Sequence, residues 1–320
     1  MMKSQRGIAL LTVLWVLTLL MVIVFSFSFL ARTETLSTMA FKEGMEQRFL
    51  AEAGIERGIV ELIYRKQNLL IEDRQVWKTD GTPFSDQLGD GGYRVKLFDE
   101  SGKIDINFAP EILLKNLIQN LGLEGEALDT VVDSIMDWKD KDDLHCLHGA
   151  ESDYYQSLPN PYKAKNGFFD TLEELLMVKG VTREILFGSE KQKGLMEFLT
   201  VHGKTARINV NAAPKEVLTA IPGVTAEMAE ALITYRQVQE VKNMPELGTL
   251  WGQNLAQINP FVSLSSSNTF TIESLGYKKN HRSGSGIRAT ITLVGNNQYK
   301  VLYYKTLDTG PLGVNETPIN

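Results

Sequence analysis

The chain begins with MMKSQRG (residues 1–7), and IALLTVLWVLTLLMVIVFSFSFLA (residues 8–31) follows without a single charged side chain. At about 1.5 Å rise per residue, a helix of that length spans the roughly 30 Å hydrocarbon core of a membrane. The segment must be helical because lipid offers no hydrogen-bond partners to the backbone. Lys3 and Arg6 precede the apolar run, so the positive-inside rule places the N-terminus in the cytoplasm. The rest of the chain, after the apolar run, then lies on the opposite side of the membrane from the cytoplasm.

The helix is expected to continue past the membrane as a stem. Residues 33–68 contain no proline, and Ile55, Ile59 and Leu62 fall on one helical face that needs a sheet to rest on. Alternating or β-rich runs predict strands at residues 93–98, 269–275, 287–294 and 299–304. Helix formers at helical spacing predict helices at residues 111–120, 128–137, 172–177, 183–187, 216–220 and 226–236. This order predicts an α+β fold, an antiparallel sheet with a large helical insertion.

The helical part contains two internal echoes. Residues 104–110 resemble residues 208–214, each a strand-like run ending in a proline before a helix. Residues 175–184 resemble residues 218–227, each a helix, a glycine-containing hairpin, and a threonine that caps the next helix. Such pairs resemble the helix-hairpin-helix (SAM-like) modules of DNA-binding proteins, which hold phosphate at the hairpin. A membrane-anchored DNA-binding or competence protein is therefore one alternative.

Composition limits the other functions. The formal net charge of −6 argues against non-specific binding of nucleic acid, so no nucleic-acid partner is predicted. Cys146 is the only cysteine, which excludes an internal disulfide. The chain contains no nucleophile elbow, phosphate loop or zinc-protease motif, and we predict that it is not an enzyme. A membrane-anchored hydrolase with a calcium-stabilised fold remains a third class.

A short acidic segment is the best candidate for a metal site. Carboxylates this dense repel one another unless water or a cation lies between them, and hard oxygen ligands suit Ca²⁺. The predicted ligands are Asp137, Asp140, Asp142, Glu151 and Asp153. The segment is no EF-hand, because Leu144 and His145 stand where an oxygen ligand and a glycine belong. A solvated acidic loop is the alternative. His145, Cys146 and His148 are too closely spaced for a usual zinc framework, and we interpret them as loop residues.

The junction Gln5-Arg6-Gly7-Ile8-Ala9-Leu10-Leu11 resembles the signal of type IV pilins and type II secretion pseudopilins. The resemblance implies that a prepilin peptidase cuts after Gly7, leaving Ile8 as the methylated N-terminus. Most members carry glutamate at the fifth position after the cut, whereas this chain has Thr12. That departure is typical of the K-type minor pseudopilins, or general secretion pathway protein K family. The phrases at residues 137–142 and 149–155 also resemble their calcium-binding region.

The resemblance implies a minor pseudopilin that caps the pseudopilus tip and initiates its assembly for protein secretion across the outer membrane. Implied partners are the I and J minor pseudopilins and the prepilin peptidase, then the major pseudopilin, the secretin and secreted substrates. The implied location is the inner membrane, with the bulk periplasmic and, after assembly, at the pseudopilus tip. The expected parts are a leader (1–7), transmembrane helix (8–31), stem and first strands (32–102), helical insertion with the acidic metal-binding loop (103–204), second helical hairpin module (205–262) and C-terminal strands (263–320).

Overall fold

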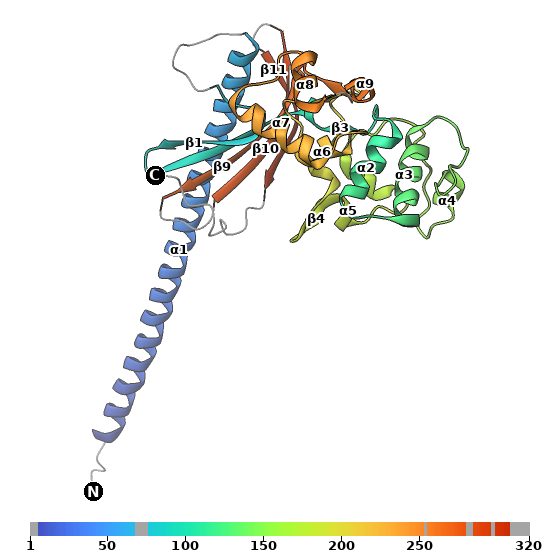
Figure 1. Cartoon of the computed structure of the whole chain (residues 1–320). Helices are drawn as coiled ribbons and strands as arrows, with labels where there is room; N and C mark the ends of the chain where they lie inside the picture. Colours follow the sequence, from blue (N-terminus) through green and yellow to red (C-terminus); the bar gives the residue numbers. More distant parts are fainter. Residues whose placement is uncertain (1–5, 68–75, 253–254, 280–283, 296–297, 308–320) are drawn as a thin grey trace.

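A long N-terminal helix carries a globular part at its far end (Figure 1). The computed structural model describes residues 6–67, 76–252, 255–279, 284–295 and 298–307. Helix α1 (Arg6–Lys66) has 61 residues and continues unbroken from the apolar run into the globular part. Among the described residues it is the one helix long and apolar enough to cross a membrane. The predicted continuation of the membrane helix as a stem is confirmed; most of the predicted leader lies outside the described residues.

The remaining elements follow in the order that gives the chain its two-part architecture. They are β1 (Asp80–Leu88), β2 (Gly91–Asp99), β3 (Ile104–Asp105), α2 (Glu111–Asn120), α3 (Gly125–Lys139), α4 (Ser152–Gln156), α5 (Arg183–Phe187), β4 (Gly188–Ser189), β5 (Gln192–Lys193), β6 (Leu199–Thr200), β7 (Ile208–Asn209), α6 (Lys215–Ala220), α7 (Ala226–Val238), α8 (Met244–Trp251), α9 (Leu255–Ile258), β8 (Val262–Ser263), β9 (Thr269–Lys278), β10 (Gly284–Val294) and β11 (Gln298–Leu307). Short 3-10 turns join several of them.

The main sheet is antiparallel with strand order β1-β2-β9-β10-β11. The apolar stripe of α1 packs against β2, β9 and β10, so that Ile55, Ile59 and Leu62 share a core with the inward face of these strands. Helix and sheet approach closely at Gly276, where an added Cβ would lie 2.0 Å from the backbone oxygen of Gln47. Only a residue without a side chain allows that approach.

The predicted strands lie within β2, β9, β10 and β11. Sequence analysis did not identify β1, because this edge strand is mostly exposed and contains Gly81 at φ +87° and Pro83. Both residues weaken a strand pattern, and both are tolerated at an edge, where one side of the ladder is unpaired. The predicted helix at Leu172–Met177 is a 3-10 helix, so its type differs from the expectation.

The helical part has one hydrophobic core, which extends in sequence from Ile104 to Val262. Both predicted helical modules therefore contribute to the same core. The helices that follow the two copies of the first echo, α2 and α6, pack directly against each other in this core. Thr182 and Thr225 cap α5 and α7 by accepting backbone N–H bonds, as the sequence predicted.

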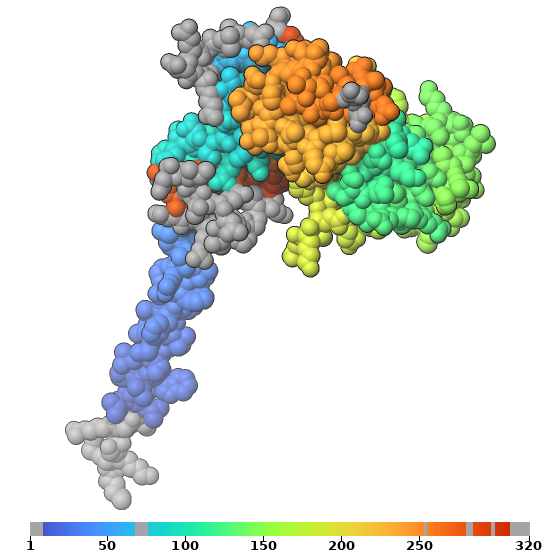
Figure 2. Space-filling model, viewed as in Figure 1, coloured from blue at the N-terminus to red at the C-terminus, as the bar shows by residue number. Residues whose placement is uncertain are grey.

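The helical part leaves and rejoins the sheet at neighbouring strand ends. Asp99 ends β2 and lies opposite Phe270 near the start of β9. The Asp99 carboxylate accepts hydrogen bonds from the backbone N–H of Ser101 (2.9 Å), the side-chain amide of Asn209 (3.3 Å) and the hydroxyl of Ser266. One buried carboxylate thus fastens the exit, the middle and the return of this excursion. Figure 2 shows the helical part standing to one side of the sheet and stem.

Candidate metal centre

Three acidic side chains from separate elements converge in the helical part. Asp137 lies in the last turns of α3, Asp140 immediately follows that helix, and Glu151 immediately precedes α4. One carboxylate oxygen from each lies within 4.8 Å of the other two. Asp137 is fully buried and Glu151 is 1 % exposed, so the cluster lies inside the protein. This spacing fits one cation held by oxygen ligands.

The loop between α3 and α4 closes over Asp137. The backbone N–H of Cys146 donates to Asp137 Oδ1 at 3.0 Å. Gly149 lies so close that an added Cβ would stand 1.9 Å from Asp137 Oδ2. The ammonium group of Lys179 donates to the carbonyl oxygens of His148 (3.2 Å) and Gly149 (3.0 Å), which fixes the far end of the loop. Gly149 and Lys179 shape the site; Gly149 lies within the phrase 149–155 that the sequence singles out, whereas no sequence signal pointed to Lys179.

The cluster leaves buried acceptors unused. Both carboxylate oxygens of Glu151 and Oδ1 of Asp140 are buried and have no hydrogen-bond partner among the described residues. Burial, together with the charges of Asp137 and Asp140, raises the pKa of Glu151 to about 7. Burial next to Asp142 and Asp137 likewise raises the pKa of Asp140. Buried acceptors without donors are costly, and a cation would relieve both this cost and the mutual repulsion. The residues present therefore fit a hard divalent cation.

The other two predicted ligands lie outside this cluster. Asp142 is exposed, and its Oδ1 accepts the backbone N–H of Leu144 at 2.9 Å. Asp153 is also exposed; it accepts the backbone N–H of Tyr154 and lies 3.0 Å from Nε2 of His145. The structure thus brings together Asp137, Asp140 and Glu151, and it uses the remaining two in local turns.

Among the described residues, Asp137, Asp140 and Glu151 are the one group of side chains arranged to hold a metal ion. His145, Cys146 and His148 do not belong to it. Burial, together with the neighbouring Asp137, raises the pKa of the Cys146 thiol to about 12. Nδ1 of His148 lies 3.6 Å from a carboxylate oxygen of Asp133.

The predicted processing site and the hairpin that resembles phosphate-binding modules both lie in ordinary helix and turn structure. Gly7 and Ile8 lie in the first turns of α1, and the hydroxyl of Thr12 donates to the carbonyl oxygen of Ala9 at 2.9 Å. The hairpin glycine Gly223 has φ +88°, as a tight turn requires. Lys215, a basic residue at the start of α6, is paired with Glu230, so its charge is already compensated.

Comparisons with known proteins point to one family. Residues 99–188, which include all three carboxylates, match the family model described as type II secretion system (T2SS), protein K. The type II secretion system protein K of Pseudomonas aeruginosa is 25% identical over 254 residues, covering 74% of each chain. The putative type II secretion system protein K of Escherichia coli K12 is 26% identical over 201 residues, covering 58% of this chain and 61% of that protein.

A solved structure shares the fold. The match is a chain of the GspK-GspI-GspJ complex from the type 2 secretion system of enterotoxigenic Escherichia coli, with a TM-score of 0.57 and 17% identity. The similarity covers 87% of this chain and 99% of that one, so the fold is shared over most of this chain.

Proposed function

Because the chain belongs to the type II secretion system protein K family, a family of minor pseudopilins, we propose that it caps the tip of the pseudopilus and initiates its assembly. The carrying observation is the placement of the helical part, which stands at the end of α1 remote from the N-terminus and to one side of the sheet (Figure 1). A subunit stacked above this one would meet that bulk, so the geometry favours a terminal position.

Thr12 supports the same position. In lipid a lone carboxylate is costly unless it meets a positive partner. A terminal subunit has no following amine to pair with, so a hydroxyl that bonds to its own helix, as Thr12 does to Ala9, is the less costly choice. We further propose that α1 anchors the chain in the inner membrane, with the N-terminus cytoplasmic and the globular part periplasmic.

The proposed partners are the I and J minor pseudopilins, because the solved structure that shares this fold is a K-I-J complex. Co-expression of the part from Thr33 onward with the cognate I and J subunits should yield a three-chain complex with equal copies on gel filtration. The matched control replaces I and J by the major pseudopilin. Elution of this part alone, whichever subunits are present, would contradict the proposed initiating role.

Processing is proposed between Gly7 and Ile8, leaving a methylated Ile8 at the N-terminus. Mass spectrometry of the membrane-extracted protein should find that start, and Gly7→Leu should leave essentially all of the precursor uncut, because the peptidase must accommodate the residue before the scissile bond. Ser4→Leu, also in the leader, is the control and should be cut normally. A mature protein that starts at Met1, or after the apolar run, would rule out this pathway.

Calcium is the proposed resident cation, held by Asp137, Asp140 and Glu151 with backbone carbonyls or water completing its shell. Its contribution is structural: it neutralises three converging carboxylates and ties the end of α3 to the start of α4. Asp142 and Asp153 are exposed, and we propose that they act in the loop turns rather than as ligands.

A further inference from the structure

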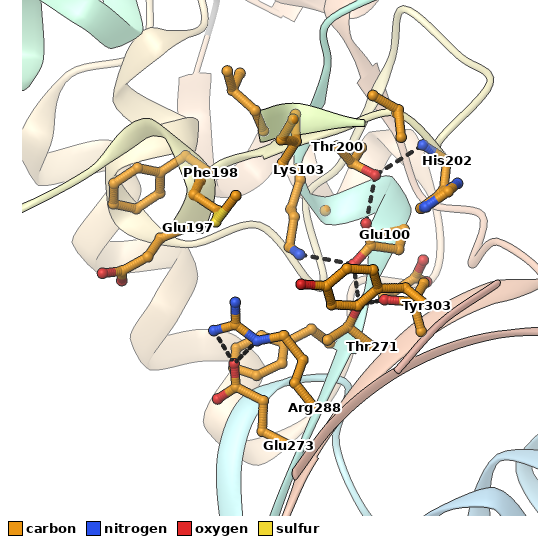
Figure 3. A pocket seen from close by; sticks show the side chains of 18 of the residues that line it. Glu100, Lys103, Glu197, Phe198, Thr200, His202, Thr271, Glu273, Arg288 and Tyr303 are labelled. Atoms are coloured by element: carbon orange, nitrogen blue, oxygen red, sulfur yellow. Dashed lines mark hydrogen bonds and ion pairs between the residues drawn. The ribbon is translucent and has the colours of Figure 1, made fainter. Parts of the chain in front are cut away.

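A cavity of about 600 Å³ separates the back face of the sheet from the helical part (Figure 3). Its floor is the sheet face opposite α1, where Lys96, Glu273 and Arg288 lie side by side on β2, β9 and β10. Its opposite wall is the segment Met196–His202 of the helical part. The cavity does not include the three converging carboxylates, so it is a separate feature of the molecule.

The side chains at the inner end of the cavity form a hydrogen-bond network with one another. Glu100 is 3 % exposed and accepts bonds from Lys103 (2.7 Å), Thr271 (2.8 Å) and Thr200. Burial opposes the ionisation of Glu100, but the Lys103 ammonium and these hydroxyls outweigh it and lower the pKa. Figure 3 shows this network behind the ring of Tyr303. These bonds hold the inner side chains to one another, so we look for a ligand in the outer part of the cavity.

Three of the seven lining carboxylates, Asp99, Glu173 and Glu197, have no cationic partner among the described residues. Glu100 pairs with Lys103, and two others pair with residues outside the lining, Asp80 with Arg236 at 3.7 Å and Asp170 with Lys165 at 2.7 Å. Glu273 is held by Arg288 at 2.8 Å. Glu173 meets only the hydroxyl of Tyr303, at 3.5 Å, while Glu197 accepts no hydrogen bond and forms no close ion pair with any described residue. A cleft with an excess of one sign concentrates ligands of the opposite sign.

Glu197 is the carboxylate best placed to receive a cation. Desolvation raises its pKa, while the neighbouring charges oppose one another, since Lys193 and Arg288 lower the pKa and Glu273 and Glu216 raise it. Glu197 is exposed, and its carboxylate has no hydrogen-bond or ion-pair partner among the described residues, so it is open to a cation from outside. The cavity also has apolar lining residues, among them Met196, which precedes Glu197 in the chain, and Leu302 on β11. A long side chain with an apolar stem and a cationic head matches both features.

We propose that this cavity binds an extended peptide segment through a lysine or arginine side chain, whose cationic head lies at Glu197 and whose stem lies along Met196 and Leu302. The volume exceeds that of one side chain and falls within the range of pockets that enclose whole ligands. Lys96, which has no hydrogen-bond or ion-pair partner among the described residues, is free to donate to a carbonyl oxygen of the same peptide. A segment with backbone acceptors therefore fits better than a free small cation.

The test uses the full-length protein in detergent at pH 7.5. The probe is a fluorescein-labelled heptapeptide, Gly-Ala-Ser-Lys-Ser-Ala-Gly, compared with versions that carry norleucine or glutamate in place of lysine. Fluorescence anisotropy should show the lysine peptide binding at least tenfold more tightly than either, about the effect of one partly desolvated charge pair. Glu197→Gln should remove about that tenfold preference and leave the norleucine peptide unaffected.

The control variant is Glu126→Gln, an exposed carboxylate of α3 that does not line the cavity. It should bind all three peptides as the unchanged protein does, and equal melting temperatures of both variants verify their folding. A lysine peptide carrying benzoylphenylalanine beside the lysine should cross-link within residues 196–202 or 298–307. Equal binding of lysine and norleucine peptides, an equal effect of both variants, full displacement by equimolar spermidine, or cross-links elsewhere would each overturn the proposal.

Discussion

Chelation of calcium is expected to lower the melting temperature of this protein by roughly 5 to 10 °C, relative to free Ca²⁺ at one hundred times its dissociation constant. Binding to the folded state alone then contributes about 2.7 kcal/mol. A domain of 150–250 residues shifts by about 2–4 °C for each kcal/mol. The physical source is the buried oxygens of Glu151 and Asp140, which have no hydrogen-bond donor among the described residues. Thermal melts in Ca²⁺ and in chelator, with elemental analysis, measure the effect.

Single substitutions separate the ligands from their acidic neighbours. Glu151→Gln should abolish the calcium-dependent shift and raise the melting temperature in chelator, because it removes a buried charge beside Asp137 and Asp140. Asp142→Asn and Asp153→Asn are the matched controls, since both side chains are exposed, and each should keep most of the shift. Loss of the shift in these controls would show that the ligand set extends into the loop. Identical melts in Ca²⁺ and chelator would discard the site.

Excision of the helical part is expected to leave a folded stem and sheet that no longer supports secretion. Because Asp99 and Phe270 are opposite one another in neighbouring antiparallel strands, Asn-Gly in place of residues 100–269 would close a two-residue hairpin. The core between α1 and the sheet contains no residue from the excised range. Circular dichroism and a cooperative melt of the part from Thr33 onward should therefore report a folded protein.

In cells, the excised variant should reduce secretion to background and give longer or more numerous filaments, because the proposed cap is gone. The control excises residues 103–204 only. That cut divides one hydrophobic core, so this protein should be unfolded or degraded. Normal secretion and normal filament length with the stably folded 100–269 variant would contradict the tip proposal.

The sequence predicted those features whose signals are local. The apolar run predicts α1, alternation predicts β2 and β9 to β11, and Thr182 and Thr225 mark the starts of helices that the structure confirms. The edge strand β1 was missed because Gly81 and Pro83 break its pattern.

The acidic site was predicted only as a region. Which carboxylates meet depends on the path of the loop between α3 and α4. Asp140 contributes an oxygen to the cluster, whereas Oδ1 of Asp142 accepts the backbone N–H of Leu144. The cavity gave no local signal, because its floor and wall come from segments such as residues 96–98, 196–202 and 302–303 that are remote in the sequence.

The hairpin-like attachment at Asp99 has a mechanical consequence. A force applied along α1 passes into β2, β9 and β10, the strands on which the helix rests, and each of these is continuous in the sheet. The helical part lies outside this route, because the chain leaves the sheet and returns to it at two adjacent strand ends. Inserted domains are commonly attached in this way. Tension on the stem therefore bypasses the helical part, which can yield against whatever it meets without weakening the subunit that carries the pull.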